Sequence, residues 1–227
     1  MSAGVVGRIT LLPAGSAVRA EAAIPGLPGP LPAGEEILWQ GKPSWTALAV
    51  RVFHVRKVAL YFALLAAWRV AAGASDGEEI SSALAFALPL VPVAAVAIGL
   101  LALLARLAAR SATYTITTRR VVMQVGIALS VTFNIPFRII GGAGLKVRRD
   151  GTGDIPLALK EGRIGYVHLW PHVRPWRLSA PEPMLRAVPD AAKVAAILAG
   201  AYLAARDAAA QPADEPSTAT DPVAVAA

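Results

Sequence analysis

One uninterrupted apolar run constrains the fold of this chain more than any other feature. Ala83–Ala105 contains 23 residues without a charge, and twelve of them are Leu, Ile, Val or Phe. About 20 such residues cross the hydrocarbon core of a bilayer as a helix, and twelve strongly apolar ones favour insertion by roughly 4–7 kcal/mol. Pro89, Pro92 and Gly99 weaken or kink a helix, which membrane helices tolerate. The run predicts a membrane-spanning helix over 83–106.

A second apolar run, Val58–Gly73, is shorter and contains Arg69. A charge at the centre of a membrane helix costs about 2.5–3.5 kcal/mol, but Arg69 lies near one end, where its side chain can reach the headgroups. Trp68 beside it suits the membrane interface. The run predicts a marginal span over 57–74. The alternative is an amphipathic helix that lies on the membrane surface.

The charges around the two runs predict their orientation. Basic residues precede the first run and follow the second, whereas the connector Ala74–Ser82 has three acidic residues and no basic one. Positively charged flanks stay in the cytoplasm. The pattern predicts a multi-pass protein with a transmembrane helical hairpin over 57–106 and both termini in the cytoplasm.

From residue 111 the hydrophobic pattern changes from helical to alternating. Val131–Pro136, Leu145–Arg148, Ile155–Leu159 and Ile164–Trp170 each place apolar side chains at every second position, as half-buried strands do. Three turn signals separate them: Gly141-Gly142, Asp150–Gly153 and Glu161-Gly162. About six or seven short strands in about seventy residues indicate an antiparallel meander that forms a small barrel or sandwich. A helix that begins near Pro189 closes a cytoplasmic domain over 111–206.

The remaining segments flank these elements. Residues 1–33 are rich in Pro and Gly and predict a flexible arm. Residues 34–56 form a juxtamembrane segment, in which the apolar run Ile37–Trp39 could add an edge strand to the later sheet or lie at the membrane surface. Residues 207–227 are acidic and rich in Ala and Pro, which predicts a disordered tail.

The positive charge belongs to the predicted cytoplasmic domain. Residues 111–206 hold thirteen basic and five acidic residues, and the whole chain has a net charge of +7. Such a surface favours an anionic partner. We expect anionic membrane lipid or acidic protein rather than nucleic acid, because no nucleic-acid recognition motif is present and the domain is anchored to a membrane.

The sequence offers little for catalysis. The absence of cysteine excludes disulfides and thiolate sites, and no HExxH, GxSxG or Walker motif occurs. Asp150–Asp154 has only two acidic residues and suits a hairpin tip better than a calcium loop. Gly141–Gly144 suits a turn better than a phosphate loop, and His168 suits a packed core position. We therefore expect no enzyme activity, no metal and no cofactor.

Several segments resemble known proteins. Tyr114–Met123 (YTITTRRVVM), after two membrane helices, resembles the start of a bacterial PH-like (pleckstrin-homology-like) domain. Leu31–Trp45, Phe53–Phe62 and Leu169–Leu178 resemble the PuhB family of photosynthetic complex assembly proteins of purple phototrophic bacteria. The resemblance implies an α+β membrane protein, in which a PH-like antiparallel β barrel or sandwich with a C-terminal helix follows the hairpin.

The resemblance also implies a function. Members of the family help to assemble the photosynthetic reaction centre and its light-harvesting 1 antenna in the bacterial inner (intracytoplasmic) membrane. The expected partners are therefore reaction-centre and light-harvesting 1 polypeptides. The alternative is a general membrane-anchored PH-like module that binds anionic lipid or envelope proteins. Self-association stays open.

Two sets of candidate site residues follow. Trp and Arg are enriched at interface hot spots, and the expected protein-contact residues are Trp170, His172, Arg174, Trp176 and Arg177. We expect Trp170 to be buried and Trp176 to be presented, and the alternative is that both belong to the core. Basic residues near anionic lipid contribute about 1 kcal/mol each. The membrane-surface candidates are Arg51, Arg56, Lys57, Arg110, Arg119, Arg120, Arg138, Lys146, Arg148 and Arg149.

Overall fold

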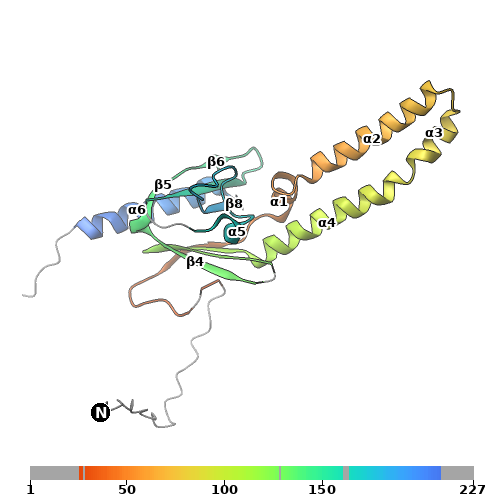
Figure 1. The fold of residues 1–227 in the computed structure, drawn as a ribbon. Helices are drawn as coiled ribbons and strands as arrows, with labels where there is room; N and C mark the ends of the chain where they lie inside the picture. Colours follow the sequence, from red (N-terminus) through yellow and green to blue (C-terminus); the bar gives the residue numbers. More distant parts are fainter. Residues whose placement is uncertain (1–25, 28, 128, 161–163, 211–227) are drawn as a thin grey trace, which may run out of the picture.

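A helical hairpin extends from one end of a domain made of two antiparallel sheets and a long helix (Figure 1). The computed structural model describes residues 26, 27, 29–127, 129–160 and 164–210. The flexible arm expected over 1–33 and the disordered tail expected over 207–227 lie for the most part outside the described residues, as does the turn expected at Glu161-Gly162.

The hairpin consists of three helices: α2 (Val55–Ser75), α3 (Ile80–Ala87) and α4 (Leu90–Ser111). The 21 residues of α2 extend over about 31 Å, close to the thickness of a bilayer core. The helices α3 and α4 are separated at Leu88–Pro89. The break therefore falls at Pro89, one of the residues expected to kink this helix. Two helical segments, α2 and Ile80–Ser111, are long and apolar enough to cross a membrane. Both contain the apolar runs that the sequence indicated.

The hairpin exposes its apolar side chains to its surroundings. Only 6% of the most apolar window of each segment is buried within the protein. The large exposed side chains include Leu60, Leu64, Trp68, Leu84, Phe86, Val96 and Leu100. A soluble protein rarely exposes so large an apolar patch, which fits contact with lipid.

Arg69 has partners at the tip of the hairpin. Its Nη1 atom lies 3.8 Å from Oε2 of Glu78, and its guanidinium lies 5.1 Å from the ring centroid of Phe86. The helices α2 and α3 approach closely here, and a Cβ atom on Gly73 would lie 3.0 Å from Ala83 Cβ and clash with Glu78 Oε2. Arg69 therefore reaches toward the end of the hairpin, as the sequence analysis expected.

The first sheet has the strand order β1-β2-β3-β4, and every pair is antiparallel. Its strands are β1 (Ile37–Gly41), β2 (Thr113–Thr117), β3 (Arg120–Val125) and β4 (Val131–Pro136). Strand β1 precedes the hairpin in the chain and pairs with β2, which follows the hairpin, with Trp39 opposite Ile116. This confirms the edge-strand interpretation of the juxtamembrane segment. Residues from both sides of the hairpin thus build one sheet.

The second sheet is centred on β7. Strand β7 (Gly153–Leu159) pairs with β5 (Ile140–Ala143), β6 (Lys146–Val147) and β8 (Met184–Val188). The loops and three short helical elements connect the layers: α1 (Trp45–Arg51), η1 (Phe137–Ile139) and α5 (Tyr166–Leu169). Within the described residues the sheets do not close into a barrel, and the open alternative of the predicted fold is therefore the one observed.

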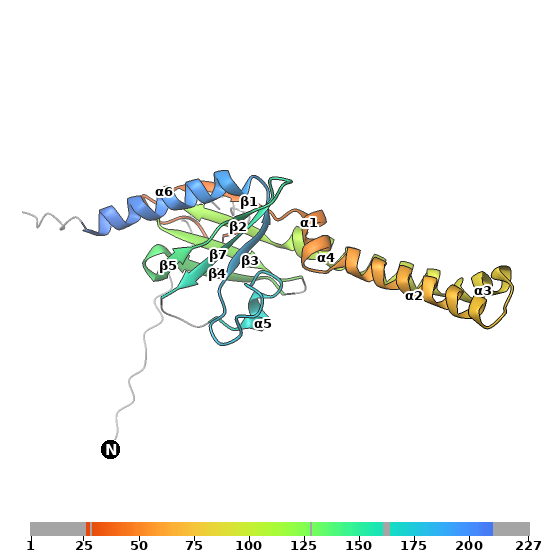
Figure 2. The same cartoon turned by 90° about the horizontal axis from the view of Figure 1, so that it is seen from above.

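The helix α6 (Ala191–Ala210) lies along the sheets and closes the core (Figure 2). It begins where the Pro189–Asp190 signal predicted. The buried core contains side chains from both sheets and from α6: Tyr114, Ile116, Met123, Ile135, Ile155, Leu157, Leu185, Val194 and Leu198.

Two local predictions were wrong. The strand expected over Ile164–Trp170 is the short helix α5 followed by a turn, in which Leu169 is buried and His168 is exposed. His168 is thus not a core residue, because a helical turn directs it away from the side on which Leu169 packs. The turn expected at Gly141-Gly142 belongs to β5, where Gly141 leaves room for the side chain of Lys160 beside the strand.

A buried carboxylate fixes the segment before the hairpin to the first sheet. Glu35 accepts hydrogen bonds from Arg120 Nε at 2.7 Å and Arg120 Nη2 at 2.8 Å. The hydroxyl of Thr117 donates a third at 2.7 Å. Burial alone raises the pKa of Glu35, but the hydrogen bonds from Arg120 and Thr117 outweigh it and hold the pKa below its usual value. This cluster joins the start of β1 to the turn between β2 and β3.

Replacing Glu35 with Ala (E35A) is expected to lower the free energy of unfolding by about 2–3 kcal/mol. The reason is that the largely buried guanidinium of Arg120 would lose its carboxylate. The neighbouring exposed Glu36 is the matched control, and E36A should change stability by less than about 0.5 kcal/mol. Chemical unfolding of the full chain in detergent micelles measures both. Equal losses in the two variants would contradict the role of Glu35.

Candidate functional site

Residues 170–183, between α5 and β8, form a loop that we call the contact loop. Its two sides lie side by side at its base, which we call the neck. It starts with a cis peptide bond between Trp170 and Pro171. At the neck Val173 forms a β-bridge with Pro183, and the Arg174 N–H donates to the Glu182 carbonyl at 3.0 Å. The backbone of both sides of the neck is thus paired, and the loop is held at its base.

A buried polar network lies under this neck. Tyr114 and His172 are almost fully buried, and the Tyr114 hydroxyl is hydrogen-bonded to Nδ1 of His172. The N–H of Arg186 donates to the Tyr114 oxygen at 3.2 Å, and Arg186 Nη1 donates to the Pro171 carbonyl at 3.0 Å. The network therefore connects the core strands β2 and β8 with the start of the contact loop.

Burial keeps both members of the pair neutral. Burial raises the pKa of Tyr114 well above its usual value. Burial, with a smaller contribution from the charge of Arg186, lowers the pKa of His172 to about 3. With Nδ1 accepting a hydrogen bond from the Tyr114 hydroxyl, a neutral His172 carries its proton on Nε2, for which no partner exists among the described residues.

Glu182 holds two of the predicted contact residues. Its Oε2 accepts from Arg174 Nη1 at 2.8 Å, and its Oε1 lies 3.1 Å from Arg177 Nη1. The carboxylate is nearly buried, whereas the two arginine side chains are about half exposed. Arg174 and Arg177 therefore support the shape of the loop and still present part of each guanidinium to a partner.

The tip of the loop presents Trp176, which is 93% exposed and has a positive φ of 66°. Leu178 beside it is also exposed. Trp170, expected to be buried, is 50% exposed, and it packs edge-on against Phe53 with ring centroids 5.6 Å apart. His172, proposed as a contact residue, is 1% exposed, because its side chain fills the core next to Tyr114. Trp176 is therefore the aromatic side chain that the loop exposes. His172 is buried and supports the loop from below.

The hairpin joins the domain at what we call the hairpin end. Leu48 of α1 is fully buried there and lies in one cluster with Ala105, Ala108 and Ala109 of α4. The guanidinium of Arg106 lies 5.7 Å from the ring centroid of Trp45. Trp170 belongs to the same region through its contact with Phe53, which is part of this cluster.

Several membrane-surface candidates gather at the hairpin end. Arg56 and Lys57 are exposed at the start of α2, and Arg110 is exposed at the end of α4. Arg51 binds Asp150 and Thr152 in the β6–β7 connection, and this hydrogen bonding, chiefly from Arg51, lowers the pKa of Asp150 to about 2.

The ion pair of Arg51 also brings the β6–β7 connection to the hairpin end. Arg149 is exposed there, and Lys146 is exposed on the adjacent strand β6. Arg148 is half-buried, with its Nη2 atom 3.4 Å from Oδ2 of Asp154. Lys146 and Arg149 are therefore available to a charged surface, whereas Arg148 is partly occupied.

Three other membrane-surface candidates lie elsewhere. Arg119 lies in the turn between β2 and β3, and Arg120 is the first residue of β3. Strand β2 runs five residues away from the end of α4, a distance of about 17 Å. Arg120 is also paired with Glu35, and Arg138 in η1 shares the region of Arg119. Nearness to α4 in sequence is therefore not nearness to the hairpin end, and a membrane contact of these three residues stays a prediction.

Sequence reasoning missed the residues that support the loop. Tyr114 and His172 are 58 positions apart, and Arg186 joins them through its backbone. No motif announces such a contact. Only the spacing of Arg174, Arg177 and Glu182 within one short segment offered a signal, since opposite charges in one loop tend to pair.

Comparisons with known proteins give a consistent result. A family model described as "Bacterial PH domain" matches residues 80–202. The chain is 46% identical over 180 residues to an "uncharacterized 23.7 kDa protein in puhA 5'region" of Rhodobacter capsulatus, which covers 78% of this chain and 84% of the relative. No solved structure matches the chain significantly.

The buried His172 predicts a pH dependence of stability. Its pKa is about 3 in the folded chain and about 6.5 when unfolded, and the unfolded state therefore binds an extra proton between these values. Stability is complete above pH 6.5 and falls by up to about 2 kcal/mol between pH 6.5 and 5. The variant His172→Gln should lose most of this dependence while being less stable at pH 7.5.

Thermal unfolding of the full chain in micelles, followed across this pH range, measures the effect. The exposed His168 provides the control, and His168→Gln should keep the wild-type slope. Parallel curves for wild type and His172→Gln would contradict the buried neutral state of His172.

Proposed function

The chain belongs to the bacterial PH domain family, and on that basis we propose that it is a membrane-anchored assembly factor for the photosynthetic reaction centre and its light-harvesting 1 antenna. The observation that carries the proposal is its relative in Rhodobacter capsulatus, which is encoded in the 5' region of puhA, a reaction-centre gene. A similarity that extends over 78% of the chain includes far more than a generic domain.

In this proposal the hairpin crosses the bacterial inner (intracytoplasmic) membrane twice. Basic residues gather at the hairpin end, and the acidic residues Asp76, Glu78 and Glu79 lie at its tip. Positively charged flanks remain cytoplasmic, and the domain with both termini is therefore placed in the cytoplasm. The exposed apolar side chains of α2, α3 and α4 face lipid.

The contact loop supplies the binding surface for reaction-centre and light-harvesting 1 polypeptides. Trp176 and Leu178 are exposed anchors on a loop whose base is fixed by paired backbone and by Glu182. A preorganised loop loses less conformational entropy on binding. The membrane tether further raises the effective concentration of membrane-bound partners.

The proposed role is binding without catalysis and without a cofactor. Tyr114 and His172, the groups with the largest pKa shifts, are buried beneath the loop and hydrogen-bonded to each other. That position suits support of the loop better than contact with a substrate.

A second candidate function is supported by the exposed basic residues Arg56, Lys57, Arg110 and Arg149 at the hairpin end. A general membrane-anchored PH-like module would use them to bind anionic lipid, each contributing about 1 kcal/mol near the surface, or to meet envelope proteins. It would act without any specific photosynthetic partner. The two candidates therefore differ in what happens to the photosynthetic complexes when the loop is changed.

Replacing Trp176 with Ala (W176A) is expected to lower the yield of the reaction centre–antenna complex at least about twofold, because truncating a hot-spot Trp costs about 2 kcal/mol of binding. Arg177 is left intact because it supports the loop through Glu182. The near-infrared absorbance of membranes, with the amount of this protein checked by immunoblot, measures the yield. L203A, at an exposed apolar position on α6, is the matched control and should leave the yield unchanged.

A deletion strain completes the test. Normal yield in both the W176A and the deletion strain would contradict the assembly role and favour the second candidate. Normal yield with W176A but a reduced yield in the deletion strain would move the contact site away from the loop.

A further inference from the structure

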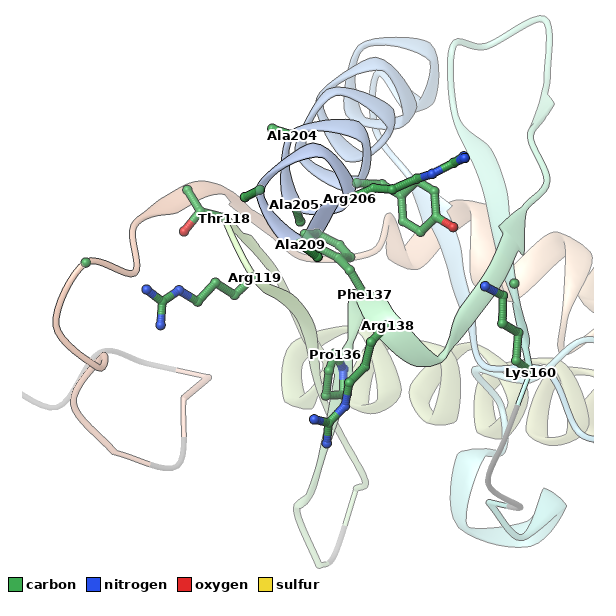
Figure 3. A pocket seen from close by; sticks show the side chains of 14 residues that line it. Thr118, Arg119, Pro136, Phe137, Arg138, Lys160, Ala204, Ala205, Arg206 and Ala209 are labelled. Atoms are coloured by element: carbon green, nitrogen blue, oxygen red, sulfur yellow. The ribbon is translucent and has the colours of Figure 1, made fainter. Parts of the chain in front are cut away.

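A groove at the end of the domain opposite the hairpin, the distal groove, collects basic side chains from four separate elements. It has a volume of about 1190 Å³. Arg119 comes from the β2–β3 turn, Arg138 from η1, Lys160 from the end of β7 and Arg206 from α6. In Figure 3 Arg119 and Lys160 lie on opposite sides of the groove with Arg138 between them.

Among the described residues, none of these four side chains has a salt-bridged or hydrogen-bonded partner. No carboxylate lines the groove in the described ranges. Glu35, which follows Gly34 of the groove lining, is paired with Arg120, and its charge also acts on Arg119. Arg138, Lys160 and Arg206 have no such carboxylate among the described residues. Four like charges around one groove repel each other, and an anionic partner would relieve that repulsion.

The floor of the groove is preformed. Phe137 packs edge-on against Tyr202 with ring centroids 6.2 Å apart, and the Tyr202 hydroxyl donates to the Ile140 carbonyl at 3.4 Å. The wall formed by α6 consists mainly of alanines, which allow another backbone to approach closely. The groove therefore combines a preformed floor with exposed charged side chains at its rim.

We propose that the distal groove binds an acidic polypeptide segment of a cytoplasmic partner. A pocket for a small ligand usually has about 300–1,000 Å³ and encloses most of the ligand, whereas this groove is larger, open and charged around its rim. An extended chain with several carboxylates matches charges that come from four elements. The inference rests on the proposed function only in that it takes the partner to be a protein.

The position of the groove argues against lipid as its ligand. The N–H of Ala191, the first residue of α6, donates to Gly151 in the β6–β7 connection, near the hairpin end. From there α6 runs for 20 residues, or about 30 Å, and its last turns line the groove. Figures 1 and 2 both show the hairpin leaving the opposite end of the domain. Headgroups around the hairpin are therefore out of reach.

Binding of a fluorescent oligo-glutamate peptide to the full chain in uncharged detergent micelles, measured by anisotropy at low salt, tests the inference. The variant R138Q/K160Q should bind about tenfold more weakly, because two ion pairs are lost. The variant K146Q/R149Q removes the same charge from exposed positions near the hairpin end and is the matched control. It should weaken binding less than about twofold.

Three results would overturn the inference. Equal weakening in both variants would indicate attraction to net charge alone. Binding of inorganic tripolyphosphate without binding of the peptide would make the groove a site for small anions. Peptide binding only after neutralisation of Asp214, Glu215 and Asp221 would identify the chain's own acidic tail as the occupant. The assay contains no photosynthetic complex, and its failure is therefore distinct from failure of the assembly role.

Discussion

The packing of α1 against the last turns of α4 determines how the whole domain is placed relative to the hairpin. Leu48 is fully buried in one cluster with Ala105, Ala108 and Ala109, and Ala187 of β8 belongs to the same cluster. The small side chains let the two helices approach closely, as small residues do at helix contacts. Only Ala112 separates α4 from β2. The direction of the hairpin is therefore transmitted to the sheets without a flexible linker, and each end of the domain has a defined orientation.

This placement separates three surfaces with different chemistry. The hairpin end carries exposed bases next to Trp45 and Trp170, as suits the interface of an anionic membrane. The contact loop projects Trp176 from a base fixed by buried Tyr114, His172 and Glu182. The distal groove holds exposed cations that form no ion pair with the described residues. If these surfaces bind lipid and protein segments as we propose, the tethered domain is suited to holding membrane-protein subunits during assembly.

The sequence predicted elements that depend on local patterns and failed where distant residues decide. The helices over 55–75 and 80–111 follow from continuous apolar runs, and the strand Val131–Pro136 and the closing helix follow from periodicity. Each segment carries its signal in itself. The burial of His172 depends on Tyr114, which is 58 positions away, and Arg120 is fixed by Glu35 across 85 positions. Likewise, β2 runs five residues away from α4 before it reaches Arg119, and Arg119 therefore lies at the distal end. Trp176 is exposed as expected, because exposure at the tip of a loop requires no distant partner.

The central claim is that the hairpin end faces the bilayer and the distal groove faces away from it. The chain contains no cysteine, and single spin labels can therefore be attached at R149C, near the hairpin end, and R138C, in the groove, in the full chain reconstituted into vesicles. Paramagnetic headgroups should relax the label at position 149 strongly and leave the label at position 138 almost unaffected, since about 30 Å of α6 separates the two ends. Equal relaxation of the two labels would contradict this orientation of the domain.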